Sequence, residues 1–268
     1  MVLVNFKTAA FFSLFLAVIL YRSQSCRSEH KTKIPIKEKE MGSSVKRILC
    51  YGDSLTAGFC LRGAKFVPYA NFLKNKLSSN GLNVEIDHYG FSGWTTQQLL
   101  SNSDKDVLKD FTGHKGPGLK KALENEKYDL LILMAGTNDL GHGKTAEDIF
   151  KNIETLAEFS LAANVSVLHV GIPDSAFLYR SSEARVKRDD VNKQMKNFAK
   201  SSKEQMITYT PCPFDFSPNS PNFDTDGLHF SEIGYQALGE GLSGVVSNLL
   251  GMKMSKFKLL LDNCLPYY

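Results

Sequence analysis

The 268-residue chain lacks the features of a fibrous, repetitive or disordered protein. It has no internal repeat and no low-complexity tract. Charged residues make up 22% of the chain and hydrophobic residues 43%. This balance excludes a collagen-like or intrinsically disordered polypeptide. The length suits one globular domain with a well-buried core and is short for two.

A basic stripe is also missing from the part of the chain that we expect to fold. The formal net charge is +4, but Arg22 to Arg47 contains eight Lys and Arg against three Asp and Glu. Lys7 adds one positive charge, so the chain from Ile48 onward has a net charge of −2. A near-neutral domain argues against nucleic acid as the main partner. We interpret residues 26–46 as a basic, solvated linker, with contact to anionic lipid as the alternative.

The N-terminus carries an apolar segment, Ala9–Tyr21. Its length suits the 7–15-residue core of a secretory signal peptide better than a membrane span of ~20 residues. The small residues Ser23–Ser25 follow it and offer a cleavage site. We therefore expect residues 1–25 to be a signal peptide that directs an extracellular protein into the secretory pathway. A retained membrane anchor at residues 8–21 is the alternative, and use of the Asn164 glycosylation sequon is left open.

Cysteine and histidine are few and scattered. Cys50 ends an apolar run, and we interpret it as a buried free thiol. One disulfide among Cys60, Cys212 and Cys264 is compatible with the sequence, but spacing does not assign it. His169 lies inside a predicted strand, and we expect a core histidine with satisfied hydrogen bonds. The histidines form no cluster with metal-ligand spacing, so we expect no metal and no cofactor.

Apolar runs typical of strands alternate with segments of helical periodicity from residue 47 to residue 250. The predicted strands are Arg47–Tyr51, Asn83–Tyr89, Tyr128–Ala135, Val165–Ile172 and Met206–Thr210. The predicted helices are Pro68–Leu77, Thr95–Leu100, Thr145–Ala163, Ser182–Ser201 and Ser231–Leu250. This alternation predicts a doubly wound α/β domain with a mainly parallel five-stranded sheet. Ser101–Gly118 reads as a long functional loop, and residues 251–268 as a C-terminal extension without an assigned place.

Residues with catalytic potential lie in the loops after four of the predicted strands. Ser54 comes directly after the first strand, and Gly93 follows the second. Asn138 follows the third strand, and Asp226 and His229 precede the last helix. In an open parallel sheet, ligands bind beyond the carboxyl ends of the strands, so these loops are expected to converge.

The residue types match the requirements of nucleophilic catalysis. A serine hydroxyl needs a base within hydrogen-bond reach, and a histidine such as His229 has a suitable pKa range. Asp226, three residues earlier, is placed to hold the imidazole in one tautomer. The oxyanion of a tetrahedral intermediate needs donors, and the backbone N–H groups of Ser54 and Gly93 and the Asn138 amide supply three.

The four blocks together resemble the SGNH hydrolase superfamily, also called GDSL esterases or lipases. They read GDSLTAGF at Gly52–Phe59, GFSGWTT at Gly90–Thr96, GTND at Gly136–Asp139 and DGLH at Asp226–His229, and they occur in the family's order. The resemblance implies a flavodoxin-like three-layer α/β/α sandwich. It also implies a metal-independent serine hydrolase that cleaves acyl esters or thioesters.

By this resemblance Ser54, Asp226 and His229 are catalytic, and Ser54, Gly93 and Asn138 form the oxyanion hole. The expected partner is a small-molecule or lipid ester. A carbohydrate O-deacetylase with the same site is one alternative, and a catalytically silent domain that binds lipid or protein is another. Acyl chain length, physiological substrate and oligomeric state are not determined by the sequence.

Four neighbouring residues have predicted supporting roles. Asp53 and Asp139 are expected to brace their turns through backbone hydrogen bonds. His142 either lines the site or is an ordinary loop histidine. Trp94 either walls the acyl pocket or packs beneath its loop. Asp215 and Asp224 are rival carboxylates for the triad, but the spacing to His229 favours Asp226.

Overall fold

The computed structural model describes residues 44–202 and 206–251. Its central sheet has five strands in the order β4-β1-β7-β8-β9, and every neighbouring pair is parallel. The strands are β1 (Lys46–Asp53), β4 (Val84–Phe91), β7 (Leu130–Met134), β8 (Ser166–Val170) and β9 (Ile207–Thr210). All five predicted strands are therefore present.

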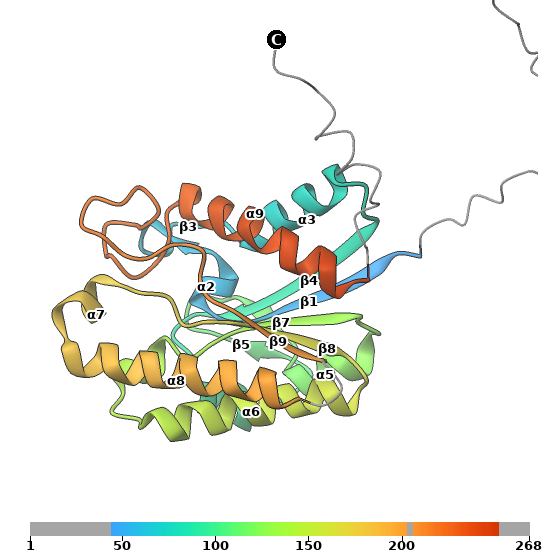
Figure 1. Cartoon of the computed structure of the whole chain (residues 1–268), viewed down its shortest axis with the longest axis horizontal. Helices are drawn as coiled ribbons and strands as arrows, with labels where there is room; N and C mark the ends of the chain where they lie inside the picture. Colours follow the sequence, from blue (N-terminus) through green and yellow to red (C-terminus); the bar gives the residue numbers. More distant parts are fainter. Residues whose placement is uncertain (1–43, 203–205, 252–268) are drawn as a thin grey trace, which may run out of the picture. The chain divides into compact units, whose positions relative to one another are not determined.

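Helices cover both faces of this sheet, as Figure 1 shows. One face carries α3 (Tyr69–Ser79) and α9 (Glu232–Leu249), and the other carries α5 (Leu119–Asn125), α6 (Ala146–Ala162) and α8 (Ser182–Ser201). The short helix α4 (Thr96–Ser101) packs against α6. This arrangement confirms the expected three-layer α/β/α fold.

Alternating side chains of the buried strands separate two hydrophobic cores. Leu49 and Tyr51 of β1 belong to the core under α6 and α8. Ile48 and Cys50 point to the opposite face and pack with the residues of α3 and α9. Because successive side chains of a strand point to opposite faces, one apolar run supplies both layers.

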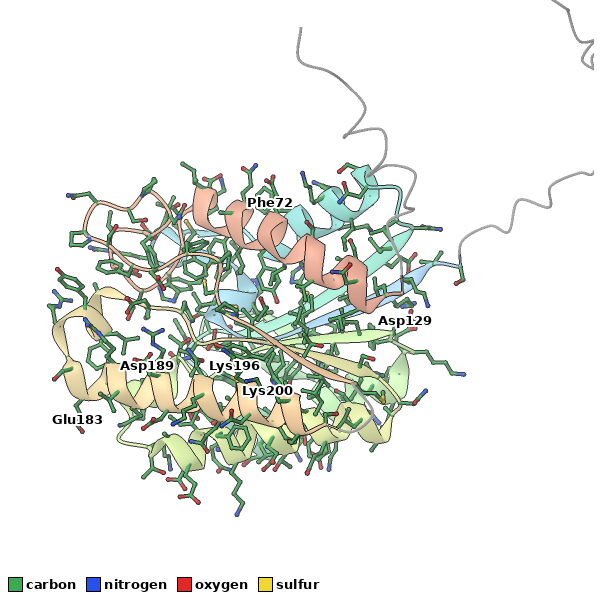
Figure 2. All side chains as sticks on the ribbon, in the orientation of Figure 1. Phe72, Asp129, Glu183, Asp189, Lys196 and Lys200 are labelled. Carbon is green, nitrogen blue, oxygen red and sulfur yellow. The ribbon has the colours of Figure 1, made fainter. Side chains whose placement is uncertain are left out.

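Two of the predicted helix starts have the caps that the sequence indicates. Thr145 caps α6 and forms a capping box with Asp148, and the Ser231 hydroxyl accepts from Gly234 N–H at the start of α9. Helix α8 has the predicted limits. Its buried side chains face the sheet, and its exposed charged side chains include the four that Figure 2 labels: Glu183, Asp189, Lys196 and Lys200.

Several short elements lie in segments that we did not predict as helix or strand. They are α2 (Ser54–Ala57), η1 (Leu61–Gly63), η2 (Asn138–Gly141), α7 (Ala176–Arg180) and the hairpins β2–β3 (Phe59–Cys60 with Lys65–Phe66) and β5–β6 (Leu108–Lys109 with Lys115–Gly116). Helix α5 was not predicted either. Each spans two to seven residues and lacks the apolar run or repeated helical spacing on which the predicted elements were based.

The described residues do not include the predicted signal peptide, most of the basic linker, Cys264 or, apart from Gly251, the C-terminal extension. Cys50 is a buried free thiol, as expected. Cys60 and Cys212 are also free thiols, so they do not form a disulfide with each other. Within residues 44–202 and 206–251, none of the helices has the length and apolar character needed to cross a membrane.

Candidate active site

Ser54 directly follows β1 and is the first residue of the short helix α2. Asp53, the last residue of β1, caps α2 by accepting a hydrogen bond from Leu55 N–H at 3.0 Å. Gly58 ends the helix in the left-handed conformation, with φ +78°. The serine is therefore the first residue of a single helical turn at the carboxyl edge of the sheet.

Close backbone approach fixes this turn against β4. A Cβ atom at Gly90 would lie only 2.1 Å from Ala57 N, a distance that no side chain tolerates. The glycine at the end of β4 thus allows α2 to rest directly on the neighbouring strand. The position of Ser54 is set by the rigid sheet rather than by a free loop.

The structure brings together three residues that are far apart along the chain. His229 Nε2 lies 3.0 Å from Ser54 Oγ, and His229 Nδ1 lies 2.8 Å from Asp226 Oδ2. Ser54 is 4% exposed, and the side chains of His229 and Asp226 are 13% and 30% exposed. The three groups thus form a continuous hydrogen-bonded line from a nearly buried hydroxyl to a partly solvated carboxylate.

The charge of Asp226 sets the direction of these hydrogen bonds. Partial burial pulls the pKa of Asp226 upward, but hydrogen bonds from the His229 ring and from the Leu228 and His229 backbone outweigh it and lower that pKa to about 2. An ionised carboxylate only accepts, so Nδ1 of the neutral imidazole carries the proton. Nε2 is then free to accept from the Ser54 hydroxyl.

Backbone hydrogen bonds hold the segment that carries Asp226 and His229. Asp224 N–H donates to His229 O at 2.8 Å, which closes the loop on itself. Gly227 has φ +66°, and its carbonyl accepts from Ala176 N–H of α7 at 2.8 Å. The ring of Phe59 lies over the imidazole at a centroid distance of 4.3 Å. The histidine is therefore held by its own loop, by α7 and by an aromatic neighbour.

Gly93 and Asn138 lie beside each other on adjacent loops. Gly93 has φ +80°, in the left-handed region. The Asn138 amide nitrogen donates to Trp94 O, the carbonyl next to Gly93, at 2.8 Å. The second hydrogen of that amide is left for another acceptor. The two predicted oxyanion donors are thus neighbours in space.

Asp139 joins the same two loops, a role that the sequence did not identify. We predicted that it braces its own turn, but its carboxylate accepts from Thr96 N–H at 2.9 Å and from the Thr96 hydroxyl at 2.6 Å. Asp139 is fully buried. It therefore fixes the GFSGWTT loop to the GTND loop. Asp53, in contrast, braces its own turn as predicted.

The buried carboxyl of Asp53 makes a testable contribution to stability. Burial raises its pKa to about 6, well above the ordinary value of an aspartate. In the unfolded chain Asp53 ionises near pH 4, while in the folded protein it stays protonated up to about pH 6. The free energy of unfolding should therefore fall as the pH rises through this window.

We expect Asp53→Asn to remove this pH dependence. The neutral amide oxygen still accepts from Leu55 N–H, so the helix cap is kept. Between about pH 4 and pH 6, wild type should lose up to about 3 kcal/mol of stability relative to the variant. Urea unfolding at several pH values measures this difference, with Asp190→Asn on the exposed side of α8 as the control. Parallel profiles of wild type and Asp53→Asn would contradict the raised pKa.

Three other predicted residues have mixed outcomes. His169 is fully buried, as expected, but neither ring nitrogen has a hydrogen-bond partner among the described residues, so the prediction of a satisfied histidine was wrong. Burial lowers its pKa to about 4, which keeps the ring neutral. His142 is exposed, with Nδ1 2.7 Å from Asn138 O. Trp94 stacks on Phe91 at a centroid distance of 4.8 Å and so packs beneath its loop.

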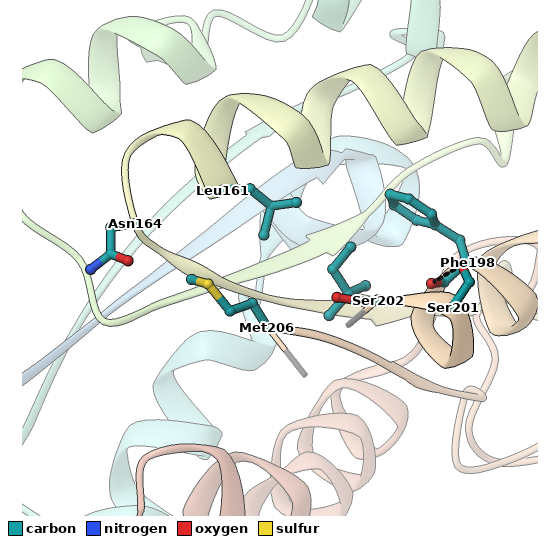
Figure 3. A pocket seen from close by; sticks show the side chains of 7 residues that line it. Leu161, Asn164, Phe198, Ser201, Ser202 and Met206 are labelled. Atoms are coloured by element: carbon teal, nitrogen blue, oxygen red, sulfur yellow. Dashed lines mark hydrogen bonds between the residues drawn. The ribbon is translucent and has the colours of Figure 1, made fainter. Parts of the chain in front are cut away.

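Other sites receive no support from the described residues. Across residues 44–202 and 206–251, no three His, Cys, Asp or Glu side chains gather as metal ligands would. A pocket at the opposite, amino end of the strands is lined by residues of α6, α8 and the start of β9 (Figure 3). It includes Asn164 of the glycosylation sequon but none of the predicted catalytic residues.

Asp110 was overlooked in the sequence although it supports the Gly93 loop. It lies in the long segment that we predicted as a functional loop, and its carboxylate accepts from Ser92 N–H at 2.7 Å. The same carboxylate accepts from the Thr112 hydroxyl and from the backbone N–H groups of Thr112 and His114. An aspartate followed by a threonine two residues later is a local turn signal, but its link to Ser92 needs the fold.

Comparisons with known proteins identify the family of the chain. The model of the GDSL-like Lipase/Acylhydrolase family matches residues 50–237. An isoamyl acetate-hydrolyzing esterase of Schizosaccharomyces pombe is 24% identical over 207 residues, which cover 75% of each chain.

Two examples represent the solved structures with a similar fold. The family 3 carbohydrate esterase of Clostridium thermocellum has a TM-score of 0.59 at 20% identity and covers 78% of this chain and 98% of its own. The lipase/acylhydrolase of Enterococcus faecalis has a TM-score of 0.59 at 20% identity, with coverages of 76% and 96%. The family match spans the four sequence blocks that the fold brings to one edge of the sheet. The chain therefore belongs to the GDSL-like lipase/acylhydrolase family and is an esterase of that family.

Proposed function

We propose that this esterase cleaves carboxylic esters through a Ser54–His229–Asp226 triad. The observation that carries the proposal is the line of two hydrogen bonds, 3.0 Å from Ser54 Oγ to the imidazole and 2.8 Å from the imidazole to the carboxylate. In this scheme Ser54 Oγ attacks the ester carbonyl carbon while His229 Nε2 takes the hydroxyl proton. The ionised Asp226 stabilises the imidazolium that forms.

The remaining steps use the same groups. The protonated imidazole gives its proton to the departing alcohol oxygen, which breaks the ester bond and leaves an acyl group on Ser54. A water molecule, deprotonated by His229, then attacks the acyl carbon. The acid leaves, and the proton returns to Ser54 Oγ. Each proton that the imidazole takes up is released again within one turnover.

We assign the oxyanion of both tetrahedral intermediates to donors from three loops. These are the backbone N–H groups of Ser54 and Gly93 and the side-chain amide of Asn138. The Asn138 amide is already oriented by its bond to Trp94 O, and Asp139 ties the loops together through Thr96. Donors fixed before the reaction need no reorganisation when charge develops, and this is what makes such a site effective.

The substrate that we propose is an uncharged short-chain ester. The fission-yeast relative is named for the hydrolysis of isoamyl acetate, which is the acetate ester of an apolar alcohol. A panel of p-nitrophenyl esters from acetate to dodecanoate tests the reaction class on purified protein. We expect the highest kcat/KM for the short acyl chains and a progressive loss for long ones.

The same panel separates the alternatives. Release of acetate from acetylated glycans, with little action on simple acetate esters, would favour the carbohydrate O-deacetylase. A protein that binds esters without hydrolysing any of them would favour the catalytically silent domain. The intact hydrogen-bonded line between Ser54, His229 and Asp226 supports the active esterase over the silent domain.

A further inference from the structure

The described part of the chain carries an unusually exposed aromatic side chain beside the proposed site. Phe111 is 76% exposed, more than any other large hydrophobic side chain of residues 44–202 and 206–251. It lies in the turn of the β5–β6 hairpin, between Lys109 and Lys115. An exposed phenyl ring gains nothing from folding, because its apolar surface stays in water. Folding therefore does not account for this exposed ring, whereas binding of an apolar group would bury it.

The hairpin that carries Phe111 is held firmly. Asp110 is 5% exposed, and its carboxylate accepts four hydrogen bonds, one of them from Ser92 N–H next to Gly93. Leu108 is buried in the core, and Gly116 lies so close to Tyr89 that an added Cβ atom would be 2.6 Å from Cδ1 of that ring. Phe111 is therefore an exposed ring on a fixed support, so that its position relative to Gly93 is defined.

The ring of Phe111 adjoins both halves of the proposed machinery. A Cβ atom built on Gly93 would lie 3.1 Å from Phe111 Cε1, so the ring edge lies close to the residue that carries a proposed oxyanion donor. The centroid of the Phe111 ring is 6.5 Å from that of Phe59, whose ring is 4.3 Å from the His229 imidazole. Phe59 itself is only 9% exposed, so Phe111 provides the exposed apolar surface between the imidazole and the Gly93 loop.

We propose that Phe111, backed by the buried ring of Phe59, binds the apolar alcohol part of the ester and selects substrates by that part. The inference rests on the proposed function, in which His229 Nε2 must reach the departing alcohol oxygen and Gly93 N–H the carbonyl oxygen. The alcohol chain leaves from the imidazole side, where the Phe59 ring lies, and the exposed ring of Phe111 is the next aromatic side chain from Phe59 toward Gly93. Substrate binding then covers the surface that Phe111 exposes to water in the free protein.

Two series of esters test this assignment. In the first, acetate is combined with ethanol, butanol or hexanol, and in the second, ethanol is combined with acetic, butyric or hexanoic acid. Burial of one CH₂ group is worth about fourfold in an equilibrium constant, so contact with several groups should raise kcat/KM clearly along the alcohol series. We expect Phe111→Ala to flatten that rise, with a loss for hexyl acetate about tenfold larger than for ethyl acetate. The variant should leave the slope of the acyl series as in wild type.

Two control variants define what the result means. Phe111→Leu keeps an apolar side chain and should restore most of the preference for long alcohols. Val107→Ala removes a 70% exposed apolar side chain from the base of the same hairpin and should leave both slopes unchanged. A loss confined to the acyl series, or an equal loss for every ester, would overturn the assignment of Phe111 to the alcohol side.

The experiment also separates this inference from the proposed function. Wild-type protein that hydrolyses esters, but whose preference among alcohols survives Phe111→Ala, overturns the inference alone. Wild-type protein that hydrolyses no ester and does not react with a fluorophosphonate at Ser54 overturns both. Circular dichroism and thermal unfolding of each variant confirm that the compared proteins are folded.

Discussion

The Ser54→Ala variant should remain folded and lose about four to six orders of magnitude in kcat for a short p-nitrophenyl ester. The Ser54 hydroxyl is the only group of the proposed triad that forms a bond to the acyl carbon, so without it there is no acyl-enzyme. Ser54 Oγ makes its side-chain hydrogen bond to His229. Alanine fits the space of serine, and the loss of this bond should change the free energy of unfolding by no more than about 1.5 kcal/mol.

The matched control is Ser160→Ala. Ser160 lies on α6, is fully buried and has no hydrogen-bond partner for its hydroxyl among the described residues. Its replacement should leave kcat within about twofold of wild type, because it is remote from the reacting atoms. Initial rates with each purified variant, at substrate concentrations around KM, measure the difference. Ester turnover by Ser54→Ala at more than a tenth of the wild-type rate would contradict a serine nucleophile at this position.

The Asp226→Asn variant should lose about 10⁴-fold in kcat while the triad keeps its geometry. An amide no longer fixes the proton on His229 Nδ1, so the neutral imidazole can present a protonated Nε2 to Ser54. It also cannot balance the positive charge of the imidazolium. Both effects act on the transition state, and substrate binding should therefore change much less than kcat.

The pH dependence adds a second test of Asp226. Since hydrogen bonds lower its pKa to about 2, the carboxylate stays ionised throughout the range in which the protein is assayed. The deficit of Asp226→Asn should therefore persist at every pH between about 5 and 8. Asp215→Asn is the control, because Asp215 is an exposed carboxylate of the same segment. An equal loss in Asp215→Asn, or activity in Asp226→Asn close to wild type, would contradict the assignment of the triad acid.

Sequence patterns were sufficient for the long elements of the fold. The five strands and the helices α3, α6, α8 and α9 all have hydrophobic periodicity over enough residues to distinguish helix from strand. Helix α8 has the predicted limits, Ser182–Ser201. The serines at its start are residues that commonly cap helices, and its charged residues continue into the last turn. The alternation of strands and helices then fixed the parallel arrangement.

Short elements and long-range contacts were beyond that reach. The β5–β6 hairpin has two residues in each strand, and its position depends on the bond from Asp110 to Ser92, 18 residues earlier. Asp139 reaches Thr96 across 43 residues rather than its own turn. Neither contact can be predicted from the pattern of residues along the chain. His169 was misread for a similar reason. Whether its ring nitrogens find hydrogen-bond partners depends on which side chains surround it in the fold.

The site itself could be predicted because four loops carry its residues at the ends of predicted strands. Parallel strands bring their carboxyl ends to one edge, so Ser54, Gly93, Asn138 and His229 were expected to meet there. The distances between them, the tautomer of His229 and the apolar cover of Phe59 and Phe111 depend on packing. We propose that these features decide substrate choice, which the sequence left open.

The proposed mechanism depends most directly on a hydroxyl at position 54 that an imidazole activates. The measurement that tests this is the reaction of the full chain with a fluorophosphonate, followed by mass spectrometry of the intact protein and its peptides. We predict one adduct per chain, located on Ser54, and a labelling rate that falls at least a hundredfold in His229→Ala. A folded protein that takes no label, or that carries it on another residue, would contradict the central claim.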